Sequence, residues 1–381
     1  MRIFYLLLTF QKPDIMFRKL LLIASFSASS LIALAQNHKL IVGTYTNKGN
    51  SEGIYVFDFD SKTADAKQVN VIKNVSNPSY LTLSKNNDFL YSVYEDGTNS
   101  AASAFKFNSQ TGEASFLNKE ATKGTNPCFI LTDGKNVITA NYSGGSISVF
   151  GIKPDGSLSN IKQNIQHTGK GPDRRQEKAH VHQVLFSPDK KYVISNDLGE
   201  DKVYIYHYDA TAEQPLKFKT SVKTNSGSGP RHLTFSPDGK YAYLAHEFNG
   251  KISAFSYKDG NLTLIQEVET VAKDFKGNID AADIHISADG KFLYESNRGD
   301  ANTISVFALQ KGGKLKFVET VSTLGKGPRN FSIDPSGNFL LVAHQYTNDV
   351  VVFNRNAKTG QLTDSKKRIN VGTPVCLVFG K

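Results

Sequence analysis

Imidazole, guanidinium and carboxylate side chains recur at equivalent places along this chain. Carboxylates and imidazoles activate water or transfer protons, and guanidinium groups hold anions and stabilise a developing oxyanion. Together these groups suit the chemistry of esters and lactones. They flank short apolar runs that repeat along the sequence, and the residues concerned are His180, His182, Asp197, Arg231, His246, Glu247, Arg298, Arg329 and His344.

A repeated segment fixes the spacing of these residues. Its clearest copy reads FSPDGKY at residues 235–241, and further copies begin near residues 83, 131, 186, 286 and 333. Pro, Asp and Gly favour tight turns, because Pro presets φ, Asp bonds its own backbone and Gly accepts a positive φ. The flanking runs are rich in β-branched and aromatic residues, as strands are. A repeat of roughly 50 residues built from short strands is typical of a β-propeller.

The two ends of the chain supply one more repeat. Residues 373–379 resemble an inner strand with nothing after it, whereas residues 40–45 and 53–57 resemble second and third strands with no first strand before them. Pairing the two ends completes a blade and removes an open edge. We therefore predict an all-β fold, a seven-bladed β-propeller over residues 36–381, whose ring is closed by the N- and C-terminal strands.

Residues 1–35 have the pattern of a secretory signal peptide. Arg18 and Lys19 precede an apolar run, and the segment Ala33-Leu34-Ala35 gives a cleavage site before Gln36. The run is short and rich in Ser and Ala, which disfavours a membrane anchor. We expect an exported, periplasmic protein with no membrane association after cleavage. Met16 is a better start than Met1, because residues 1–15 add nothing that a signal needs.

Charge and cysteine content limit the kinds of partner that the chain could bind. The formal net charge is +10, but the lysines are scattered instead of gathered in a run, so we expect a solvated basic surface and no nucleic-acid partner. A basic channel would suit a small anionic molecule. Cys128 and Cys376 fall on inner strands of blades that are not neighbours, and we predict two free, buried thiols. We expect the chain to act as a monomer.

Motifs for cofactors and metals are absent from the sequence. It has no Walker-type phosphate loop, no Gly-x-Ser-x-Gly elbow and no His-Glu-x-x-His segment. The pair His180-x-His182 could bind a metal, but no nearby Cys or carboxylate completes a ligand set. We therefore expect neither a metal nor another cofactor.

The predicted fold gathers the polar residues at one place. In a propeller, the loops that enter the first strands and those that leave the second strands meet at one mouth of the central channel. Repeat equivalence therefore predicts a ring of these side chains. Each residue also has a structural alternative: Arg231 and Arg329 could form ion pairs between blades, Glu247 could be their partner, and His180 and His182 could pack in turns. Their joint occurrence favours a site.

Several motifs match a known family. They are Arg175-Gln176 leading to His180-Val181-His182, the segment DLGED at residues 197–201, Gly229-Pro230-Arg231-His232, His246-Glu247 and Asn297-Arg298-Gly299. The chain resembles the seven-bladed propeller lactonases, which include the propeller type of 6-phosphogluconolactonase and the fungal carboxy-muconate lactonising enzymes. The resemblance covers the whole mature chain and implies lactone chemistry without a metal. It implies that the catalytic residues are His182 or His180, Arg231, Glu247 and Arg298, with Asp197 lining the same mouth.

Three functions follow from these patterns. Our first hypothesis is hydrolysis of a small anionic sugar lactone, as in a 6-phosphogluconolactonase, with His182, Arg231, Glu247 and Arg298 catalytic. His180, Asp197, His246, Arg329 and His344 are then expected to bind the lactone or sugar-acid substrate. The alternatives are a muconate-type lactonising cyclase, which would use the same groups, and a non-enzymatic propeller scaffold or ligand-binding protein. The phosphorylated lactone of such enzymes is made in the cytosol, whereas the predicted signal peptide directs this chain to export. A periplasmic sugar lactone is therefore the alternative substrate.

Overall fold

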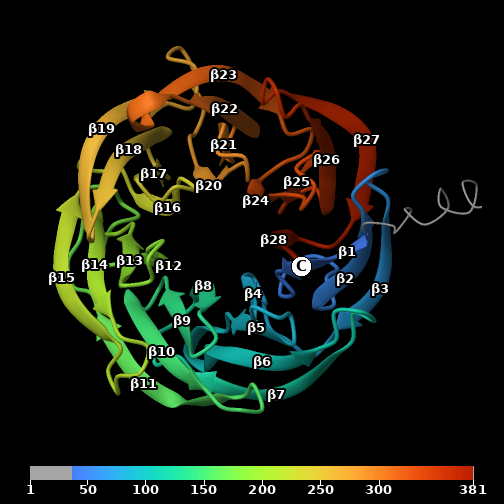
Figure 1. The fold of residues 1–381 in the computed structure, drawn as a ribbon, viewed down its shortest axis with the longest axis vertical. Helices are drawn as coiled ribbons and strands as arrows, with labels where there is room; N and C mark the ends of the chain where they lie inside the picture. The colour runs from blue at the N-terminus through green and yellow to red at the C-terminus, as the bar shows by residue number, and fades with distance from the viewer. Residues whose placement is uncertain (1–36, 381) are drawn as a thin grey trace, which may run out of the picture. The chain divides into compact units, whose positions relative to one another are not determined.

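The structure is a computed structural model that describes residues 37–380. The predicted signal peptide and the alternative start at Met16 lie outside these residues. The described chain forms seven four-stranded antiparallel sheets around a central axis (Figure 1). Two short 3-10 helices, η1 (Gly97–Asn99) and η2 (Lys311–Gly313), are the helical elements of this part. The predicted all-β, seven-bladed propeller is confirmed. None of its helices has the length and apolar content needed to span a membrane.

Each blade runs from an inner strand at the hub to an outer strand at the rim. Blade 1 contains β4 (Leu81–Leu83), β5 (Phe89–Tyr94), β6 (Ala101–Phe107) and β7 (Ala114–Ala121). Blade 2 contains β8 (Pro127–Thr132), β9 (Asn136–Asn141), β10 (Ser146–Ile152) and β11 (Leu158–Gln166). Blade 3 contains β12 (Val181–Phe186), β13 (Tyr192–Asp197), β14 (Lys202–Tyr208) and β15 (Leu216–Lys223). Blade 4 contains β16 (Pro230–Phe235), β17 (Tyr241–His246), β18 (Lys251–Lys258) and β19 (Asn261–Glu269).

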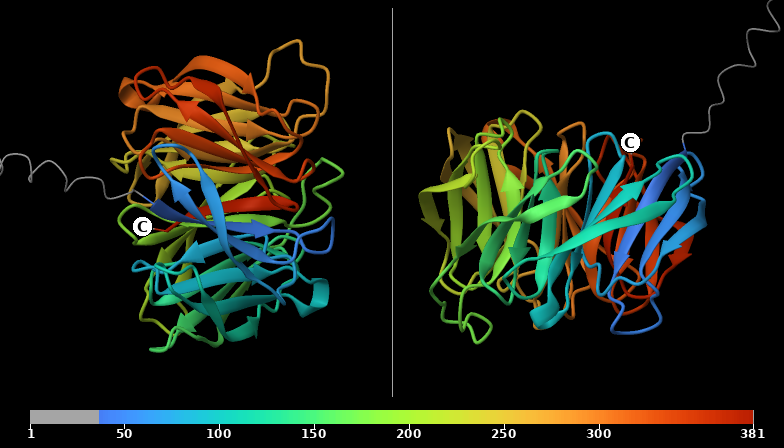
Figure 2. Two further views of the ribbon diagram at one scale, coloured as in Figure 1. Left: turned by 90° about the vertical axis from the view of Figure 1, so that its right-hand side faces the viewer. Right: turned by 90° about the horizontal axis from the view of Figure 1, so that it is seen from below.

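The remaining blades complete the ring. Blade 5 contains β20 (Ala281–Ile286), β21 (Phe292–Asn297), β22 (Thr303–Leu309) and β23 (Leu315–Ser322). Blade 6 contains β24 (Pro328–Ile333), β25 (Phe339–His344), β26 (Asp349–Arg355) and β27 (Leu362–Asn370). Blade 7 contains β28 (Pro374–Phe379), β1 (Asn37–Thr44), β2 (Ile54–Asp60) and β3 (Ala66–Ile72). Side views show the loops gathered at the two faces of the ring (Figure 2).

Blade 7 joins the two ends of the described chain. Strand β28 pairs with β1 in antiparallel register, with Leu40 opposite Phe379 and Val42 opposite Leu377. This pairing gives β28 and β1 the backbone partners that each would lack as an edge strand. The predicted closure by the terminal strands is confirmed.

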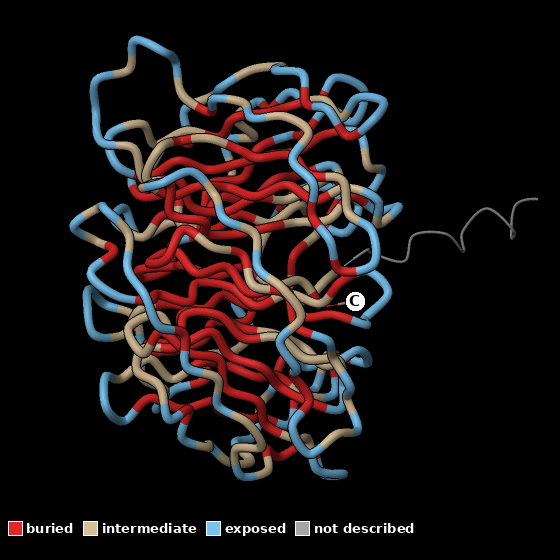
Figure 3. The backbone as a smooth tube through the Cα atoms, turned by 90° about the vertical axis from the view of Figure 1, so that its left-hand side faces the viewer, coloured by how far each residue is buried: buried red, intermediate tan, exposed pale blue. Residues whose placement is uncertain are grey.

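The core lies between the blades. Seven clusters of buried apolar side chains fill the seven interfaces between neighbouring blades. Leu40 and Val42 of blade 7 pack against Leu341 and Val352 of blade 6, and all four are fully buried. Burial of each such side chain stabilises the fold by about 1.5–3 kcal/mol. Buried segments fill the interior and exposed segments form the loops and rim (Figure 3).

The repeated turn has a common hydrogen-bond pattern. In blade 4, Ser236 Oγ donates to Asp238 Oδ1 at 2.6 Å, and the backbone N–H of Tyr241 donates to Ser236 Oγ at 3.0 Å. Gly239 has a φ of +69°, which a residue with a side chain adopts at a steric cost. This turn joins the first and second strands, so it lies at the face opposite the ends that carry the predicted site. It therefore serves the fold.

Both cysteines are buried and free, as predicted. Cys128 lies on β8 of blade 2 and Cys376 on β28 of blade 7, with blade 1 between them.

Candidate active site

Most inner strands begin with an irregularity that isolates one residue from the ladder. In blade 4, Pro230 pairs with His246 and His232 pairs with Ala245, so Arg231 has no partner across the ladder. A bulge of this kind re-aims the side chain of the extra residue. The residues skipped at the same place in four other blades are Cys128, His182, Arg329 and Val375. All five line one cavity at the hub.

We call this space the hub cavity. Its lining residues are Ser79, Tyr80, Cys128, His182, Arg231, His232, Arg329, Asn330 and Val375. The open space has room for about one water molecule. The cavity therefore brings two predicted arginines and one predicted histidine together from blades 3, 4 and 6.

A second set of side chains comes from the residues that follow the second strands. Glu247 follows β17 and Arg298 follows β21, so the two residues hold equivalent positions in blades 4 and 5. Arg231 Nε donates to Glu247 Oε2 at 2.8 Å, and Arg298 Nη2 lies 3.1 Å from the same oxygen. Glu247 thus holds two guanidinium groups in fixed positions at the mouth of the hub.

The ion-pair network extends to two residues that the sequence analysis did not propose. Arg298 Nη2 donates to Asp280 Oδ1 at 3.0 Å. Arg175 Nη1 lies 3.7 Å from Asp280 Oδ1, and its guanidinium carbon lies 3.7 Å from the centre of the Phe248 ring. Arg175 had appeared only within a family motif, and Asp280 lies just before an inner strand with no distinguishing neighbour. Contacts across blades identify them, and sequence spacing does not.

Glu247 is held in its ionised form. Burial alone would raise the pKa of this carboxyl group, but Arg298 and Arg231 outweigh burial and lower it. For Asp280 burial prevails: together with the Glu247 charge, it raises the pKa despite Arg298. Burial and Arg298 lower the pKa of Arg231 to about 10, so its guanidinium is still charged near neutral pH. Glu247 is therefore an anion that is suited to orienting two cations.

Arg329 is a cation without a fixed partner. Among residues 37–380 its guanidinium makes no hydrogen bond or ion pair, and it lies 5.6 Å from the centre of the Tyr45 ring. Burial alone would lower the pKa of Arg329, but Tyr45 and Glu95 outweigh it and raise the pKa. Glu95 itself accepts a hydrogen bond from Ser79 Oγ at 2.7 Å. A charged guanidinium with free donors is suited to bind an anion.

The two predicted histidines of blade 3 differ in position. His182 lines the hub cavity, and burial together with Arg231 lowers its pKa well below the ordinary value, so its ring is neutral. His180 stacks on Tyr142 with ring centres 4.5 Å apart, and its Nε2 lies 3.2 Å from Glu177 Oε1. His180 does not line the hub cavity. Of the pair, His182 is placed to act on a bound molecule.

Three residues expected to bind substrate lie inside their blades instead. His246 Nε2 lies 2.8 Å from Ser253 Oγ of the neighbouring strand, and His344 Nδ1 lies 3.2 Å from Asp349 Oδ1. Asp197 accepts the backbone N–H groups of His180 and Gly199 at 2.8 and 3.0 Å. Neither the hub cavity nor the mouth cavity described below includes any of the three.

The cause of this difference is the position of each residue relative to the end of its strand. Asp197, His246 and His344 are the last residues of their second strands, whereas Glu247 and Arg298 come one residue later. The last residues are still paired in the ladder and lie inside the blade, whereas Glu247 and Arg298 lie beyond the ladder, where their side chains reach the mouth. Repeat equivalence placed both positions in one ring, and the structure separates them.

A larger space adjoins the mouth. This mouth cavity has a volume of about 440 Å³ and is lined by Tyr45, Asn47, Lys48, Asn77, Glu95, Asp96, Gly97, Asn126 and Gln345. Its size falls within the range of about 300–1,000 Å³ that small-molecule sites occupy. Tyr45, Glu95 and Gln345 follow the second strands of blades 7, 1 and 6. Amide, hydroxyl and charged groups of this kind suit a sugar.

Another hollow, of about 590 Å³, lies at the rim and not at the hub. Residues of β3, β6 and β7, among them Phe105, Phe116 and Lys119, line it. The described residues that line it include no carboxylate and no imidazole. Although this hollow is larger, it lacks the groups that could catalyse a reaction, so the charged residues at the hub are the better candidate site.

One cluster of the described residues has the composition of a metal site. Ligand atoms of His167, Asp197 and Glu200 all lie within 4.8 Å of one another. Lys202 Nζ, however, donates to Glu200 Oε2 at 2.6 Å, and His167 Nδ1 lies 2.7 Å from Asp197 Oδ2. The Lys202 ammonium already neutralises part of the negative charge of this cluster, so a metal cation would gain little by binding there.

The fold and the hub site together define a propeller enzyme of the lactonase class. The model of the family described as "Lactonase, 7-bladed beta-propeller" matches residues 39–379, and the chain belongs to this family. The resemblance drawn from the motifs is confirmed. The protein is a lactonase, which is a carboxylic ester hydrolase.

Similar proteins span nearly the whole chain. The 6-phosphogluconolactonase of Bacillus subtilis is 39% identical over 350 residues, which cover 89% of this chain and 97% of that protein. A solved structure from Bacteroides fragilis is 43% identical, with a TM-score of 0.87, and covers 91% of this chain and 98% of that one. The periplasmic gluconolactonase of Pseudomonas aeruginosa is 37% identical, with a TM-score of 0.86, and covers 90% and 99% of the two chains.

Proposed function

We propose that this chain hydrolyses a small anionic sugar lactone at the hub, in the manner of a 6-phosphogluconolactonase. One observation carries the proposal: Arg231 and Arg298 share the Glu247 carboxylate at the mouth of a cavity that Arg329 also lines. Ring opening of a lactone passes through a tetrahedral oxyanion, and fixed cations stabilise that charge more strongly than mobile water does.

The proposed roles follow from the charges. Arg231 and Arg298 hold the carbonyl oxygen as it becomes negative, and Glu247 keeps their guanidinium groups in place. Glu247 Oε2 is already engaged by both guanidinium groups. The proton of water is therefore assigned to a neutral imidazole of the hub cavity, for which His182 is one candidate. A positioned base contributes about 10²–10⁴-fold to a rate.

Arg329 supports an anionic substrate. Its guanidinium is the cation of the hub that no described carboxylate pairs, and it stands beside the mouth cavity that Tyr45 also lines. A guanidinium binds a phosphate or carboxylate through two parallel hydrogen bonds. The side-chain amides of Asn47 and Gln345 line the same cavity, and Gln345 Oε1 has no hydrogen-bond partner among the described residues, so these amides suit the hydroxyl groups of a sugar.

The compartment decides between two substrates. The sequence pattern of residues 1–35 predicts export, and we propose that the mature chain acts in the periplasm. The similarity to a periplasmic gluconolactonase of Pseudomonas aeruginosa supports this proposal. In that compartment an unphosphorylated sugar lactone is the alternative to a phosphorylated one.

A lactone panel tests the proposal. The purified chain is assayed with 6-phosphoglucono-δ-lactone, glucono-δ-lactone and a neutral γ-lactone, after subtraction of spontaneous hydrolysis. We expect hydrolysis of a sugar lactone, with the ratio of the two gluconolactone rates deciding which substrate the site prefers. Absence of hydrolysis above background for every lactone would contradict the proposal and favour a binding protein.

A further inference from the structure

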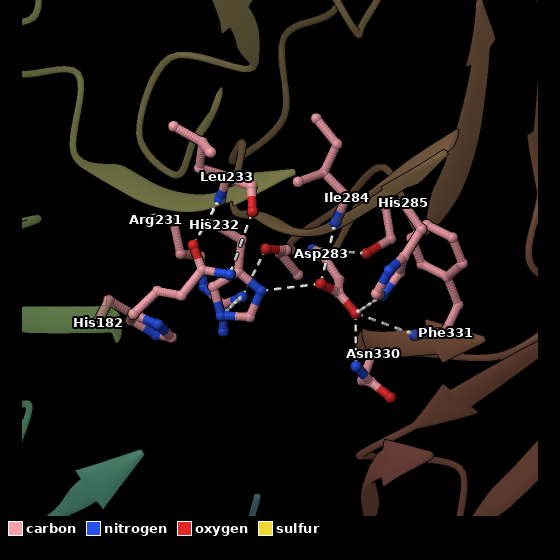
Figure 4. A network of polar contacts seen from close by, with 12 residues as sticks. His182, Arg231, His232, Leu233, Asp283, Ile284, His285, Asn330 and Phe331 are labelled. Carbon is pink, nitrogen blue, oxygen red and sulfur yellow. Dashed lines mark hydrogen bonds and ion pairs between the residues drawn. The ribbon is translucent and has the colours of Figure 1, made fainter. Parts of the chain in front are cut away.

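A buried carboxylate connects two histidines at the hub. Asp283 Oδ1 lies 2.8 Å from His232 Nδ1, and Asp283 Oδ2 lies 2.9 Å from His285 Nε2. Asn330 Nδ2 and the backbone N–H of Ile284 also donate to this carboxylate. The side chain of Asp283 is only 2% exposed. Figure 4 shows Asp283 between the two rings, which come from the neighbouring blades 4 and 5.

His232 is the member of this network that reaches the hub cavity. Its ring lines the cavity together with Arg231 and His182, and the centres of the two histidine rings are 5.1 Å apart. Tyr80 and Phe129 meet the His232 ring edge-on, at 6.2 and 5.5 Å between centres. These contacts and the bond to Asp283 hold the ring in one orientation.

The partner of Nδ1 determines what Nε2 can do. An ionised carboxylate only accepts hydrogen bonds, so His232 Nδ1 must carry the proton that it shares with Asp283. In a neutral ring the other nitrogen, Nε2, then carries the lone pair. Arg231 Nη1 donates a long hydrogen bond to this nitrogen at 3.5 Å, so Nε2 faces the guanidinium group of the site, and water reaches the lone pair by displacing this contact.

The surroundings keep the carboxylate charged and His232 neutral. Burial would raise the pKa of Asp283, but His285 and His232 outweigh burial and hold it well below the ordinary value. Burial and Arg231 lower the pKa of His232 to about 4. The ionisable groups that face this pair are His182 on β12, Arg231 on β16, His285 on β20, Glu295 on β21, Arg329 on β24, Cys376 on β28, Cys128 on β8 and Tyr80 before β4.

We propose that His232, oriented by Asp283, is the base that activates the hydrolytic water in the hub cavity. This inference rests on the proposed function and adds a catalytic residue, His232, and a positioning residue, Asp283. Neither belongs to the set of His182, Arg231, Glu247 and Arg298 that the family resemblance implies.

The reaction balances without another reactant. Water gives a proton to His232 Nε2 while its oxygen bonds to the carbonyl carbon, and the carbonyl electron pair moves to the oxygen held by Arg231. Collapse of this oxyanion restores the carbonyl and breaks the bond to the ring oxygen. The ring oxygen takes the proton back from His232, which gives a hydroxy acid. This product then loses one proton to solvent.

The alternatives for the base are less well placed. No carboxylate orients His182, whose buried Nδ1 has no hydrogen-bond partner among the described residues. Glu247 is committed to two guanidinium groups. Of these three candidates, only His232 combines a place in the cavity, a defined tautomer and a neutral ring.

Three variants test the proposal. His232→Gln removes the base, and Asp283→Asn keeps the shape of the positioning residue but removes its charge. His207→Gln is the matched control, because His207 is an exposed histidine of β14 that does not line the hub cavity. We expect kcat to fall about 10²–10⁴-fold in His232→Gln with little change in KM, and His207→Gln to keep nearly full kcat. Thermal melting confirms that each variant is folded.

The pH profile separates catalysis from a structural role. With His232 as the base, kcat/KM of the wild type falls as pH drops through the pKa of His232, which is about 4. Asp283→Asn removes the charge that favours protonated His232, so the acid limb moves to lower pH while the plateau falls. A purely structural Asp283 would lower the plateau and leave the limb in place. If His232→Gln does not fold, this shift in Asp283→Asn decides the matter.

Each outcome has a defined meaning. Imidazole added to a His232→Gly variant should restore part of the lost rate, because it can occupy the space of the missing ring. Full kcat in His232→Gln, combined with a large loss in Arg231→Ala, would overturn the role of His232 and leave the proposed function intact. Absence of lactone hydrolysis by the wild type would overturn both.

Discussion

Arg231 Nε donates a 2.8 Å hydrogen bond to Glu247 Oε2 across sixteen residues of the same blade. Arg231 is the residue isolated by a bulge in the inner strand, and Glu247 is the first residue after the second strand. Two irregular backbone positions therefore meet at the hub, and a second guanidinium, from Arg298 of the next blade, shares the same carboxylate. The site is built where the regular strand pattern is interrupted.

Glu247→Gln should lower kcat more than it affects KM. The amide keeps the shape of the side chain but no longer neutralises Arg231 and Arg298, which then lose their fixed positions around the oxyanion. We expect a loss of about 10²-fold in kcat, the scale of one misplaced oxyanion group. Steady-state kinetics with a sugar lactone measures it. Glu319→Gln is the control, since Glu319 accepts a backbone hydrogen bond at the rim; equal kinetics of the two variants would contradict the role.

Arg329→Gln should impair binding of anionic lactones selectively. The hydrogen bonds of a guanidinium to a charged group contribute about 1.5–3 kcal/mol, so KM for a phosphorylated lactone should rise about tenfold or more. KM for a neutral lactone should change little. Arg368→Gln controls for net charge, because Arg368 pairs with Asp364 on the outer strand of blade 6. An equal change in KM for anionic and neutral lactones would show that Arg329 does not bind the anionic group of the substrate.

A chelator should leave the enzyme unchanged. The cluster of His167, Asp197 and Glu200 already has a cation in Lys202, and the hub site relies on guanidinium groups for its positive charge. We expect the same kcat and the same melting temperature with and without a divalent-metal chelator. Loss of activity that an added divalent ion restores would assign a metal to the protein.

Glu295 should make stability depend on pH. This fully buried residue of β21 accepts a hydrogen bond from Asn297 Nδ2 at 2.8 Å, and burial raises its pKa from 4.5 to about 8. The folded protein therefore keeps a proton that the unfolded chain releases, and stability falls as pH rises from about 4.5 to about 8.

Glu295→Gln should remove this dependence, because the amide stays neutral. We expect the variant to melt at a temperature close to that of the wild type at pH 5 and at a higher temperature at pH 8. The free energy of unfolding at pH 8 should rise by on the order of a few kcal/mol. Calorimetry at both values measures the difference. The same shift at pH 5 and pH 8 would show that ionisation of Glu295 is not the cause.

The sequence predicted the fold because its turns repeat. Ser236, Asp238 and Gly239 form a turn whose hydrogen bonds and positive φ follow directly from the residue types, and similar segments recur in the other blades. The terminal strands could be recognised because the last repeat lacked its other half. Periodicity of this kind is a property of the chain and needs no knowledge of contacts.

The site could be predicted only in part. Repeat equivalence selected Arg231, Glu247 and Arg298, which the structure brings together. It also selected His246, which is still paired in the strand and bonds Ser253 inside the blade. His232 was not predicted as a site residue, because a bulge that the sequence does not reveal places it beside Arg231 in the same cavity.

Guanidinium groups at the hub are proposed to perform the lactone chemistry. The most direct measurement of their role is kcat/KM for sugar-lactone hydrolysis by Arg231→Ala beside Arg355→Ala. Arg355 is also a buried arginine, but it bonds Tyr294 away from the hub cavity. We predict a loss of about 10²-fold or more in Arg231→Ala and near wild-type activity in Arg355→Ala, with both variants folded. Full activity of a folded Arg231→Ala variant would contradict the account.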